Sequence, residues 1–257
     1  MGMDRSSLRW GEYGVNWDSP QAKGLVGWWP ECQFDIVGGH HARPTGSPVQ
    51  RPSIMGPALS LNNTFNYRSV AHHSDLINVN NLTISMWVFP RTTANGRDPF
   101  SKRTNANTGF LTVEYTGTTG GFNFYFDQHN SGYQAGTDDV SGTMVLVRWN
   151  HLAFTWDVND AARLYVNGVQ VDSQAAAGAL NTNTADIVFG ADPAFGRVSD
   201  VMLRDIRIYR VTCNSRTVAG MFKPDSRYDL YLPHGRRTWF VPPATGNRRR
   251  RVLLGAS

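Results

Sequence analysis

Short runs of alternating apolar and polar residues recur along the chain from about Gly24 to Tyr209, separated by clusters of Gly, Asn, Asp and Thr. In the run GFNFYF, every second residue is a phenylalanine. Because successive side chains of a strand point to opposite faces of a sheet, this period of two predicts half-buried antiparallel strands. A single segment, SRTVAGMF, is predicted as a short helix, with Asn214 or Ser215 as its N-cap. The chain is therefore expected to be all-β.

The dipeptide Asn167-Gly168 lies between the strand-like runs RLYV and VQVD. Both residues of a type I′ turn need positive φ, which Asn and Gly tolerate, so a two-residue hairpin is predicted here. Such a turn sets four opposed pairs: Val166 and Val169, Tyr165 and Gln170, Leu164 and Val171, Arg163 and Asp172. One face of this hairpin is then wholly apolar, which predicts that the hairpin packs on a core.

The stretch RWNHLAFTWDVNDAARLYVNGVQVDS, residues 148–173, resembles the laminin-G-like branch of the concanavalin A-like lectin/glucanase superfamily. The matching positions are Trp149, His151, Ala153, Leu164, Tyr165, Asn167 and Gly168. Other segments of the chain are similar to the family's opening strand, to the segment after it, and to its closing strands and helix. They occur in the same order as in the family, so the resemblance covers roughly Gly24–Phe222. It implies a jelly-roll sandwich of two antiparallel sheets, one of them curved, with the first and last strands side by side.

Glycoside hydrolases occur among these relatives, and they need two carboxyl groups that flank the scissile bond. The hydrolase branch carries these groups as alternating acids on one strand. This chain has three glutamates, Glu12, Glu31 and Glu114, which are far apart in the sequence. No Gly-x-Ser-x-Gly, His-Glu-x-x-His or Gly-rich phosphate loop is present either. We therefore expect that the protein is not an enzyme.

The loop DQHNSGYQAGTDD gathers oxygen-bearing side chains around two glycines. Its candidate ligand-binding residues are Asp127, Asn130, Tyr133, Asp138 and Asp139. Carboxylates and carbonyls are the ligands that calcium prefers, and a tyrosine ring stacks on sugars. The alternative, which the composition favours, is a solvated loop whose Asp and Gly residues make turns. No cofactor is expected, and calcium binding is left open.

Several further side chains are candidates for binding. Tyr115, Tyr125, Tyr133 and Trp87 are potential stacking surfaces, although a tryptophan in a two-sheet sandwich often fills a core corner. Asp192, Asp200 and Asp205, near the closing strands, are interpreted as turn and surface residues. The two cysteines, Cys32 and Cys213, are expected to be free buried thiols.

The formal net charge of +5 comes from the tail, because residues after position 235 include Arg236, Arg237, Arg248, Arg249, Arg250 and Arg251. The body is near neutral without them, which argues against nucleic-acid binding. No window is apolar enough to span a membrane, and the N-terminus has no apolar stretch of the secretory kind. The domain organisation is predicted as an N-terminal arm (1–23), a jelly roll (24–222) and a C-terminal arm (223–257).

The C-terminal arm combines prolines, arginines and apolar residues, which predicts an extended segment that orders on a partner. Its candidate partner-binding residues are Tyr231, Arg236, Arg237, Trp239, Phe240 and the four arginines 248–251. A laminin-G-like body with such a tail resembles proteins of bacteriophage virions. This resemblance implies a decoration subunit on the outer surface of the particle, bound to the major capsid protein or another virion protein. A homo-oligomer such as a trimer is left open, and so is contact of the outward-facing jelly roll with a cell-surface glycan. The alternative is an extracellular carbohydrate-binding lectin or adhesin.

Overall fold

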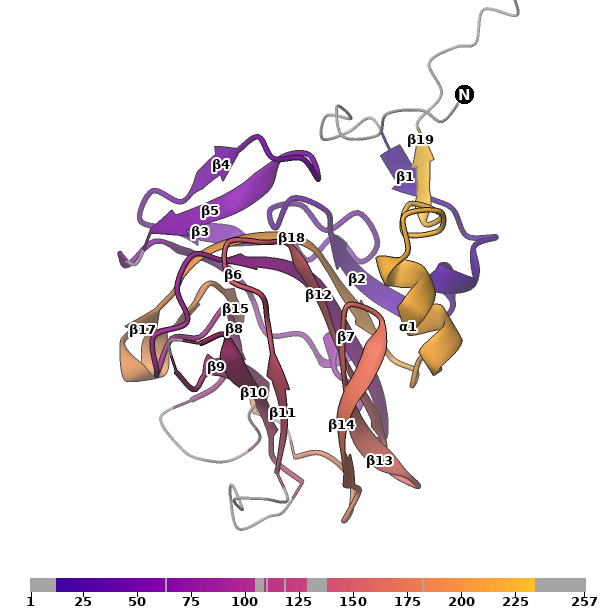
Figure 1. Ribbon diagram of the computed structural model, residues 1–257. Helices are drawn as coiled ribbons and strands as arrows, with labels where there is room; N and C mark the ends of the chain where they lie inside the picture. The colour runs from indigo at the N-terminus through magenta and orange to yellow at the C-terminus, as the bar shows by residue number, and fades with distance from the viewer. Residues whose placement is uncertain are drawn as a thin grey trace, which may run out of the picture.

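The computed structural model describes residues 13–62, 64–104, 109, 111–117, 119–128, 138–181 and 183–233. Two large antiparallel sheets pack face to face (Figure 1), so the predicted all-β jelly-roll sandwich is confirmed. The strand-like runs of the sequence form these sheets because each presents an apolar row to the interior and a mainly polar row to the outside.

The larger sheet contains eight strands. From one edge to the other they are β14 (Val169–Ala175), β13 (Ala161–Val166), β12 (Asn150–Asp157), β7 (Asn81–Pro90), β18 (Asp200–Tyr209), β5 (Ala58–Asn62) and β4 (Val49–Arg51), with β2 (Leu25–Trp29) paired to β18. The pairing of β2 with β18 places the first and last strands of the jelly roll side by side, as the sequence predicts. In Figure 1 the long strand β18 bends over the molecule.

The smaller sheet contains seven strands. In order they are β11 (Asp139–Thr143), β10 (Gly121–Phe126), β9 (Leu111–Tyr115), β8 (Phe100–Lys102), β15 (Ile187–Phe189), β6 (Tyr67–Val70) and β3 (Arg43–Thr45). The main core lies between the two sheets. There the ring of Phe124 stacks on that of Phe154, with centroids 4.0 Å apart, and the other phenylalanines of β10 are also buried. The alternation of the GFNFYF run is therefore confirmed.

The predicted hairpin joins β13 and β14, and both Asn167 and Gly168 have positive φ. Val166 pairs with Val169 as expected, but a bulge then shifts the register, so that Leu164 faces Asp172 rather than Val171. The predicted apolar face is also wrong, because Val169 and Val171 are 66% and 47% exposed. The reason is that β14 is the edge strand of its sheet, and a bulge twists the edge of a sheet.

The helix α1 (Ser215–Phe222) begins where the sequence predicts, and Asn214 Oδ1 accepts a hydrogen bond from the backbone N–H of Thr217 at 2.9 Å. Its buried residues Val218 and Met221 pack on the outer face of the larger sheet, where they form a second apolar cluster with Trp28 and other side chains. Within the described ranges, no helix has the length and apolar character needed to cross a membrane. Cys32 and Cys213 are buried and free, as expected.

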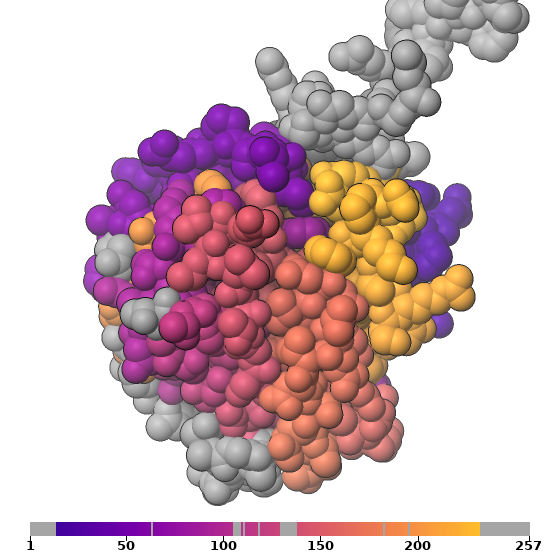
Figure 2. Space-filling view, viewed as in Figure 1, coloured from indigo at the N-terminus to yellow at the C-terminus, as the bar shows by residue number. Residues whose placement is uncertain are grey.

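The segments that flank the jelly roll are folded onto it. β1 (Tyr13–Val15) pairs with β19 (Tyr231–Pro233) in a separate two-stranded ribbon. Leu230 and Tyr231 are buried in the cluster beneath α1. Figure 2 shows α1 and the residues that follow it up to position 233 in yellow, against the body between the indigo residues that begin at position 13 and the orange surface of β13 and β14. Part of the outer face of the larger sheet is thus covered by described residues that flank the jelly roll on both sides.

A small ribbon lies on the outer face of the smaller sheet. It consists of β16 (Ala191–Asp192) and β17 (Arg197–Val198), joined by a short 3-10 helix, η4 (Pro193–Phe195). Ala191 and Val198 pack on Val188 of β15, with Tyr67 against the cluster. This third, small apolar cluster fixes the position of η4 above the sheet.

Candidate functional site

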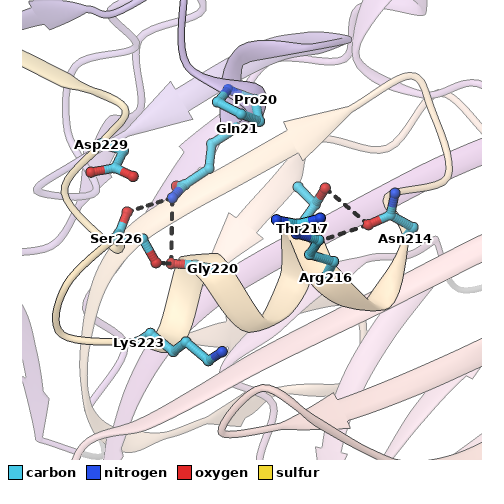
Figure 3. Close-up of a pocket in the computed structure, with 9 residues that line it drawn as sticks. All are labelled: Pro20, Gln21, Asn214, Arg216, Thr217, Gly220, Lys223, Ser226 and Asp229. Carbon is cyan, nitrogen blue, oxygen red and sulfur yellow. Dashed lines mark hydrogen bonds between the residues drawn. The ribbon is translucent and has the colours of Figure 1, made fainter.

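A cavity of about 550 Å³ lies beside α1 (Figure 3). Its lining residues come from both chain ends: Pro20, Gln21, Asn214, Arg216, Thr217, Gly220, Lys223, Ser226 and Asp229. Gln21 donates to the carbonyl oxygen of Ser226 at 2.5 Å and accepts from Arg207 Nη1 at 2.6 Å. Ser226 Oγ donates to the carbonyl of Gly220 at 2.9 Å. The inner polar groups therefore serve to join the terminal segments to the sandwich.

A second hollow, of about 240 Å³, lies on the outer face of the smaller sheet and is called here the sheet-face pocket. It is lined by Tyr67, Ser69, Arg103, Asp186, Val188, Pro193 and Ala194. Its lining residues thus include an aromatic, a basic and an acidic residue. Convergent polar groups beside an aromatic surface are the usual chemistry of a small-molecule site.

Strand register explains how these residues meet. β15 lies between β6 and β8, and Val188 is opposite Ser69 on one side and Ser101 on the other. Because side chains alternate along β6, Tyr67 and Ser69 point outward while Arg68 and Val70 point into the sandwich. Ser69 and Val188 thus form the floor of the sheet-face pocket.

The two ends of the pocket carry different chemistry. Tyr67 lies at one end, with Pro193 and Ala194 of η4. At the other end the exposed Asp186 precedes β15, and its Oδ1 accepts the backbone N–H of His72 at 3.2 Å. The antiparallel pairing of β6 with β15 separates these ends along the strand direction. The pocket therefore offers an apolar ring at one end and a carboxylate at the other.

A buried lysine holds the segment that leads to Asp186. Lys102 is 1% exposed, and its Nζ donates to the carbonyl oxygens of Asn183 and Ala185 at 2.6 and 3.0 Å and to Asn183 Oδ1 at 2.8 Å. Burial lowers the pKa of Lys102 to about 8, and the neighbouring Asp186 opposes this effect. Three oxygens around one ammonium group fix the loop, and with it the carboxylate of the pocket.

Around the β16–β17 ribbon, next to the pocket, lies a network of carboxyl and guanidinium groups. Asp192 caps η4 by accepting the N–H of Ala194 at 3.1 Å, and its Oδ2 is 3.8 Å from Arg103 Nη1. The carboxyl groups of Asp98 and Asp192 influence each other electrostatically, and both residues are fully buried. Burial first, and then the neighbouring carboxylates, raise the pKa of Asp98 to about 9, so this pair holds a proton at neutral pH.

Arg197 completes this network. It pairs with Glu114, and its Nη1 lies 3.7 Å from Asp98 Oδ2. Sequence reasoning missed these residues: it treated Glu114 as isolated and Asp192 as a surface residue, whereas the fold brings Asp98, Glu114 and Asp192 around Arg197. The interpretation of Asp205 as a surface residue is likewise wrong, because it is 5% exposed. Their spacing in the sequence gave no signal, since they meet only through strand pairing.

The structure describes only some of the residues in the 127–139 loop that are predicted to bind a ligand. Asp127 is buried and accepts hydrogen bonds from the N–H of Gly109 at 2.6 Å and from Asn181 Nδ2 at 3.0 Å. Asp138 is also buried, and Asp139 accepts from Asn123 Nδ2 at 3.0 Å. Asn130 and Tyr133 lie outside the described residues. Ligand binding by this loop stays a prediction.

Metal binding and the aromatic candidates can be placed as well. In the part of the chain that the structure describes, no group of three or more His, Cys, Asp and Glu residues is arranged to hold a metal ion.

Two of the predicted stacking surfaces are buried: Tyr115 and Trp87 are 0% and 3% exposed. Tyr125 is half-buried on the outer face of β10. The protruding aromatic side chain of the smaller sheet's pocket is instead Tyr67.

Only one of the predicted partner-binding residues of the tail falls within the described part of the chain. Tyr231 is 4% exposed and its ring packs edge-on against Trp28, so within the fold it is an internal contact. The others lie outside the described residues: Arg236, Arg237, Trp239, Phe240, Arg248, Arg249, Arg250 and Arg251. Their role in partner binding stays a prediction.

Solved structures with a similar fold come from binding domains. Domain 4 of AbnA, a GH43 extracellular arabinanase from Geobacillus stearothermophilus, in complex with arabinotriose, is 19% identical with a TM-score of 0.62, over 77% of this chain and 98% of that one. The binding domain of botulinum neurotoxin DC in complex with rat synaptotagmin II is 14% identical with a TM-score of 0.61, and that of Paraclostridial Mosquitocidal Protein 1 is 17% identical with a TM-score of 0.61. Both alignments cover 77% of this chain, but they cover only 51% and 52% of the botulinum and the paraclostridial chain, respectively.

Sequence comparison gives the family. The chain matches no curated protein sequence. Residues 62–219, more than half of the chain, match the laminin-G family model described as "Concanavalin A-like lectin/glucanases superfamily". This match spans the strands from β6 to β18 and most of α1, and therefore both sheets of the sandwich. The chain thus belongs to the concanavalin A-like lectin/glucanase superfamily.

Proposed function

We propose that the protein is a non-catalytic carbohydrate-binding module that holds a sugar ring in the sheet-face pocket. The observation that carries this proposal is that Tyr67, Arg103 and Asp186 line one pocket on the outer face of a lectin-like sheet. A sugar ring has an apolar C–H face and a rim of hydroxyl groups. An aromatic ring beside a hydrogen-bond donor and an acceptor is complementary to both.

The arrangement suggests a role for each group. The phenol ring of Tyr67, which packs on Val188 and its neighbours, offers the stacking surface. The carboxylate of Asp186 accepts hydrogen bonds from sugar hydroxyls, and the guanidinium of Arg103 donates them. Both polar groups are positioned by the chain itself, Asp186 through His72 and the Lys102-held loop and Arg103 beside Asp192. Preorganised groups of this kind lose little entropy when a ligand binds.

The relatives of known structure agree with a binding role. The arabinanase domain was solved in complex with arabinotriose, and a botulinum neurotoxin DC binding domain was solved in complex with SialylT. Each is less than 20% identical to this chain, so neither indicates which sugar is bound. They support the class of ligand, a glycan, and not its identity.

The acid groups next to the pocket favour binding over hydrolysis. Glycosidases place two carboxyl groups on either side of the bond that they cleave. Here Asp98 and Asp192 are fully buried, and Glu114 is ion-paired with Arg197. Among the described residues of the pocket, Asp186 is the single acid. One carboxylate supplies a hydrogen-bond acceptor but not the pair that hydrolysis requires.

A glycan array tests this proposal. The full-length protein is applied together with Tyr67→Ala and Asp186→Asn, and Tyr125→Ala serves as the matched control because Tyr125 is half-buried on the outer face of the same sheet. We expect wild type and the control to bind the same glycans and the two pocket variants to bind at least about tenfold more weakly. Wild type that binds no glycan, or pocket variants that bind like wild type, would overturn the proposal.

A second candidate is the virion decoration role, which one observation favours. The two terminal segments meet in the β1–β19 ribbon, so the residues beyond them start from the same place. In Figure 1 this ribbon and β17, next to the sheet-face pocket, lie at opposite sides of the molecule. Tails bound to a capsid protein would then leave the pocket facing outward. Quantitative mass spectrometry of density-purified particles tests this role, and absence of the protein from particles would contradict it.

A further inference from the structure

An exposed phenylalanine lies next to the sheet-face pocket. Phe65 is 59% exposed, two residues before Tyr67. We infer that its ring forms a second subsite, so that the ligand is a chain of at least two sugar rings and not a single terminal sugar. This inference rests on the proposed function, since it extends the same site from the Tyr67 end.

The position of Phe65 follows from its contact with the turn after η4. A Cβ atom placed on Gly196 would lie 3.9 Å from Phe65 Cζ. Gly196 ends η4, whose first residues Pro193 and Ala194 line the pocket next to Tyr67. Phe65 and the pocket therefore flank the same three-residue helix. The order along the sheet face is Asp186, the floor at Ser69 and Val188, Tyr67, and then Phe65.

The loop that presents Phe65 is held by hydrogen bonds on both sides. Asn66 Oδ1 accepts the backbone N–H of Ser47 at 2.8 Å, and Asn66 Nδ2 donates to Thr64 Oγ1 at 2.5 Å. Thr64 Oγ1 in turn donates to Asn62 Oδ1 at 2.8 Å. Gly46, with φ of 68°, passes so close to Asn66 and the carbonyl of Phe65 that a side chain there would collide with them. The aromatic ring is thus kept at the surface by a preorganised loop.

The chemistry of the adjoining pocket indicates what the ring contacts. A single exposed apolar side chain needs no functional explanation by itself. Phe65, however, adjoins a pocket that is also lined by Asp186 and Arg103, two polar residues to which a purely apolar ligand could make no hydrogen bond. A linear oligosaccharide satisfies both, because each ring has hydroxyl groups for the polar end and a C–H face for the aromatic rings.

The test is an array of linear oligosaccharides graded by length. It carries arabinan, glucan, xylan, mannan and galactan fragments of one to six residues, and sialylated oligosaccharides, each probed with the full-length protein. Phe65→Ala is compared with Trp17→Ala, which removes an aromatic ring that is 62% exposed near the N-terminal segment. Melting curves of both variants check that they are folded.

We expect wild type to prefer fragments of two or more residues over the monosaccharide. Phe65→Ala should weaken binding of the longer fragments about tenfold and leave monosaccharide binding unchanged. Trp17→Ala should bind like wild type. Equal affinity for all lengths, or no effect of Phe65→Ala, would overturn the second subsite while leaving the proposed function intact. If wild type binds no fragment at all, the proposed function fails, and the second subsite fails with it.

Discussion

Tyr231 and Trp28 meet edge to face, with ring centroids 4.6 Å apart and ring planes at 85°, although they come from opposite ends of the chain. Trp28 is fully buried, and Tyr231 is 4% exposed. Val15 and Leu230 are buried in the same cluster. Residues 223–233 of the predicted C-terminal arm are therefore part of the folded body, and the rest of that arm, residues 234–257, lies outside the described residues.

Removal of the Tyr231 ring tests this structural role. We expect Tyr231→Ala to lower the free energy of unfolding by about 3 kcal/mol, because it leaves a cavity against Trp28. Deletion of residues 234–257 should leave stability unchanged, whereas deletion of residues 223–257 should destabilise the protein at least as much as Tyr231→Ala. Urea unfolding followed by tryptophan fluorescence measures all three. Equal stability of the two deletion variants would contradict the assignment.

A buried ion pair fastens the covered face of the larger sheet. Arg207 donates to both oxygens of Asp205, from Nε at 2.9 Å and from Nη2 at 2.7 Å, and Trp28 Nε1 donates to Asp205 Oδ1 at 2.6 Å. Burial alone would raise the pKa of Asp205, but Arg207 and the hydrogen bonds of Arg207 and Trp28 lower it below its ordinary value. The carboxylate is therefore held charged at neutral pH.

Breaking this pair leaves an uncompensated buried guanidinium. We expect Asp205→Ala to cost about 3 to 5 kcal/mol in the free energy of unfolding. Asp160→Asn is the matched control, since the Asp160–Arg163 pair lies at the surface and should cost no more than about 1 kcal/mol. Chemical denaturation measures both variants. If the two cost the same, Asp205 does not hold the terminal segments through Arg207.

The fold could be predicted because its signals are local or repeated. Period-two alternation, the Asn167-Gly168 turn and the Asn214 cap each act within a few residues, and each is present in the structure. The hairpin register was wrong beyond Tyr165, because a bulge in an edge strand depends on the neighbouring sheet and not on the turn. Local chemistry therefore predicts the elements better than their pairing.

The candidate site could not be predicted from spacing. Tyr67, Arg103 and Asp186 are far apart in the sequence and meet only because β15 is inserted between β6 and β8. The same strand order buries Asp98 with Asp192, which otherwise have the sequence signature of turn residues. The available signal was the alternation in Tyr67–Val70, which places Tyr67 on the outer face, but it does not indicate what lies beside that ring.

His151 should make the protein sensitive to acid. Burial is the main cause that lowers its pKa to about 3, with Arg207 in support, so the folded protein holds it neutral. The unfolded chain protonates near pH 6.5, and the stability that depends on neutral His151 is present above that pH and lost as pH falls toward 3. As the pH falls from 7 to 4, this group should lower the free energy of unfolding by about 3 kcal/mol.

The substitution His151→Gln removes this titration. We expect it to be less stable than wild type at pH 7, because the ring packs 5.2 Å from that of Trp87. Its stability should nevertheless fall less steeply between pH 7 and 4, as measured by thermal melting at each pH. His73→Gln, at an exposed position, is the control and should follow wild type. A parallel pH dependence in His151→Gln and wild type would contradict the prediction.

Asp98 should make stability depend on pH in the opposite direction, so that the protein loses stability as the pH rises. Its pKa is raised to about 9 by burial and by the carboxylates of Glu114 and Asp192, so the stability that depends on its proton is complete below pH 4 and is lost as pH rises toward 9. In wild type, the free energy of unfolding should fall by up to about 1.4 kcal/mol for each unit that the pH rises in this range. Asp98→Asn keeps a neutral group of the same shape and should therefore not show this fall. Melting between pH 5 and 7 measures this difference below the range in which Lys102, with its pKa of about 8, loses most of its charge. Asp75→Asn, at an exposed aspartate, should keep the slope of wild type. If Asp98→Asn keeps that slope too, the buried pair does not carry the proton, and the network next to the sheet-face pocket is ionised at neutral pH.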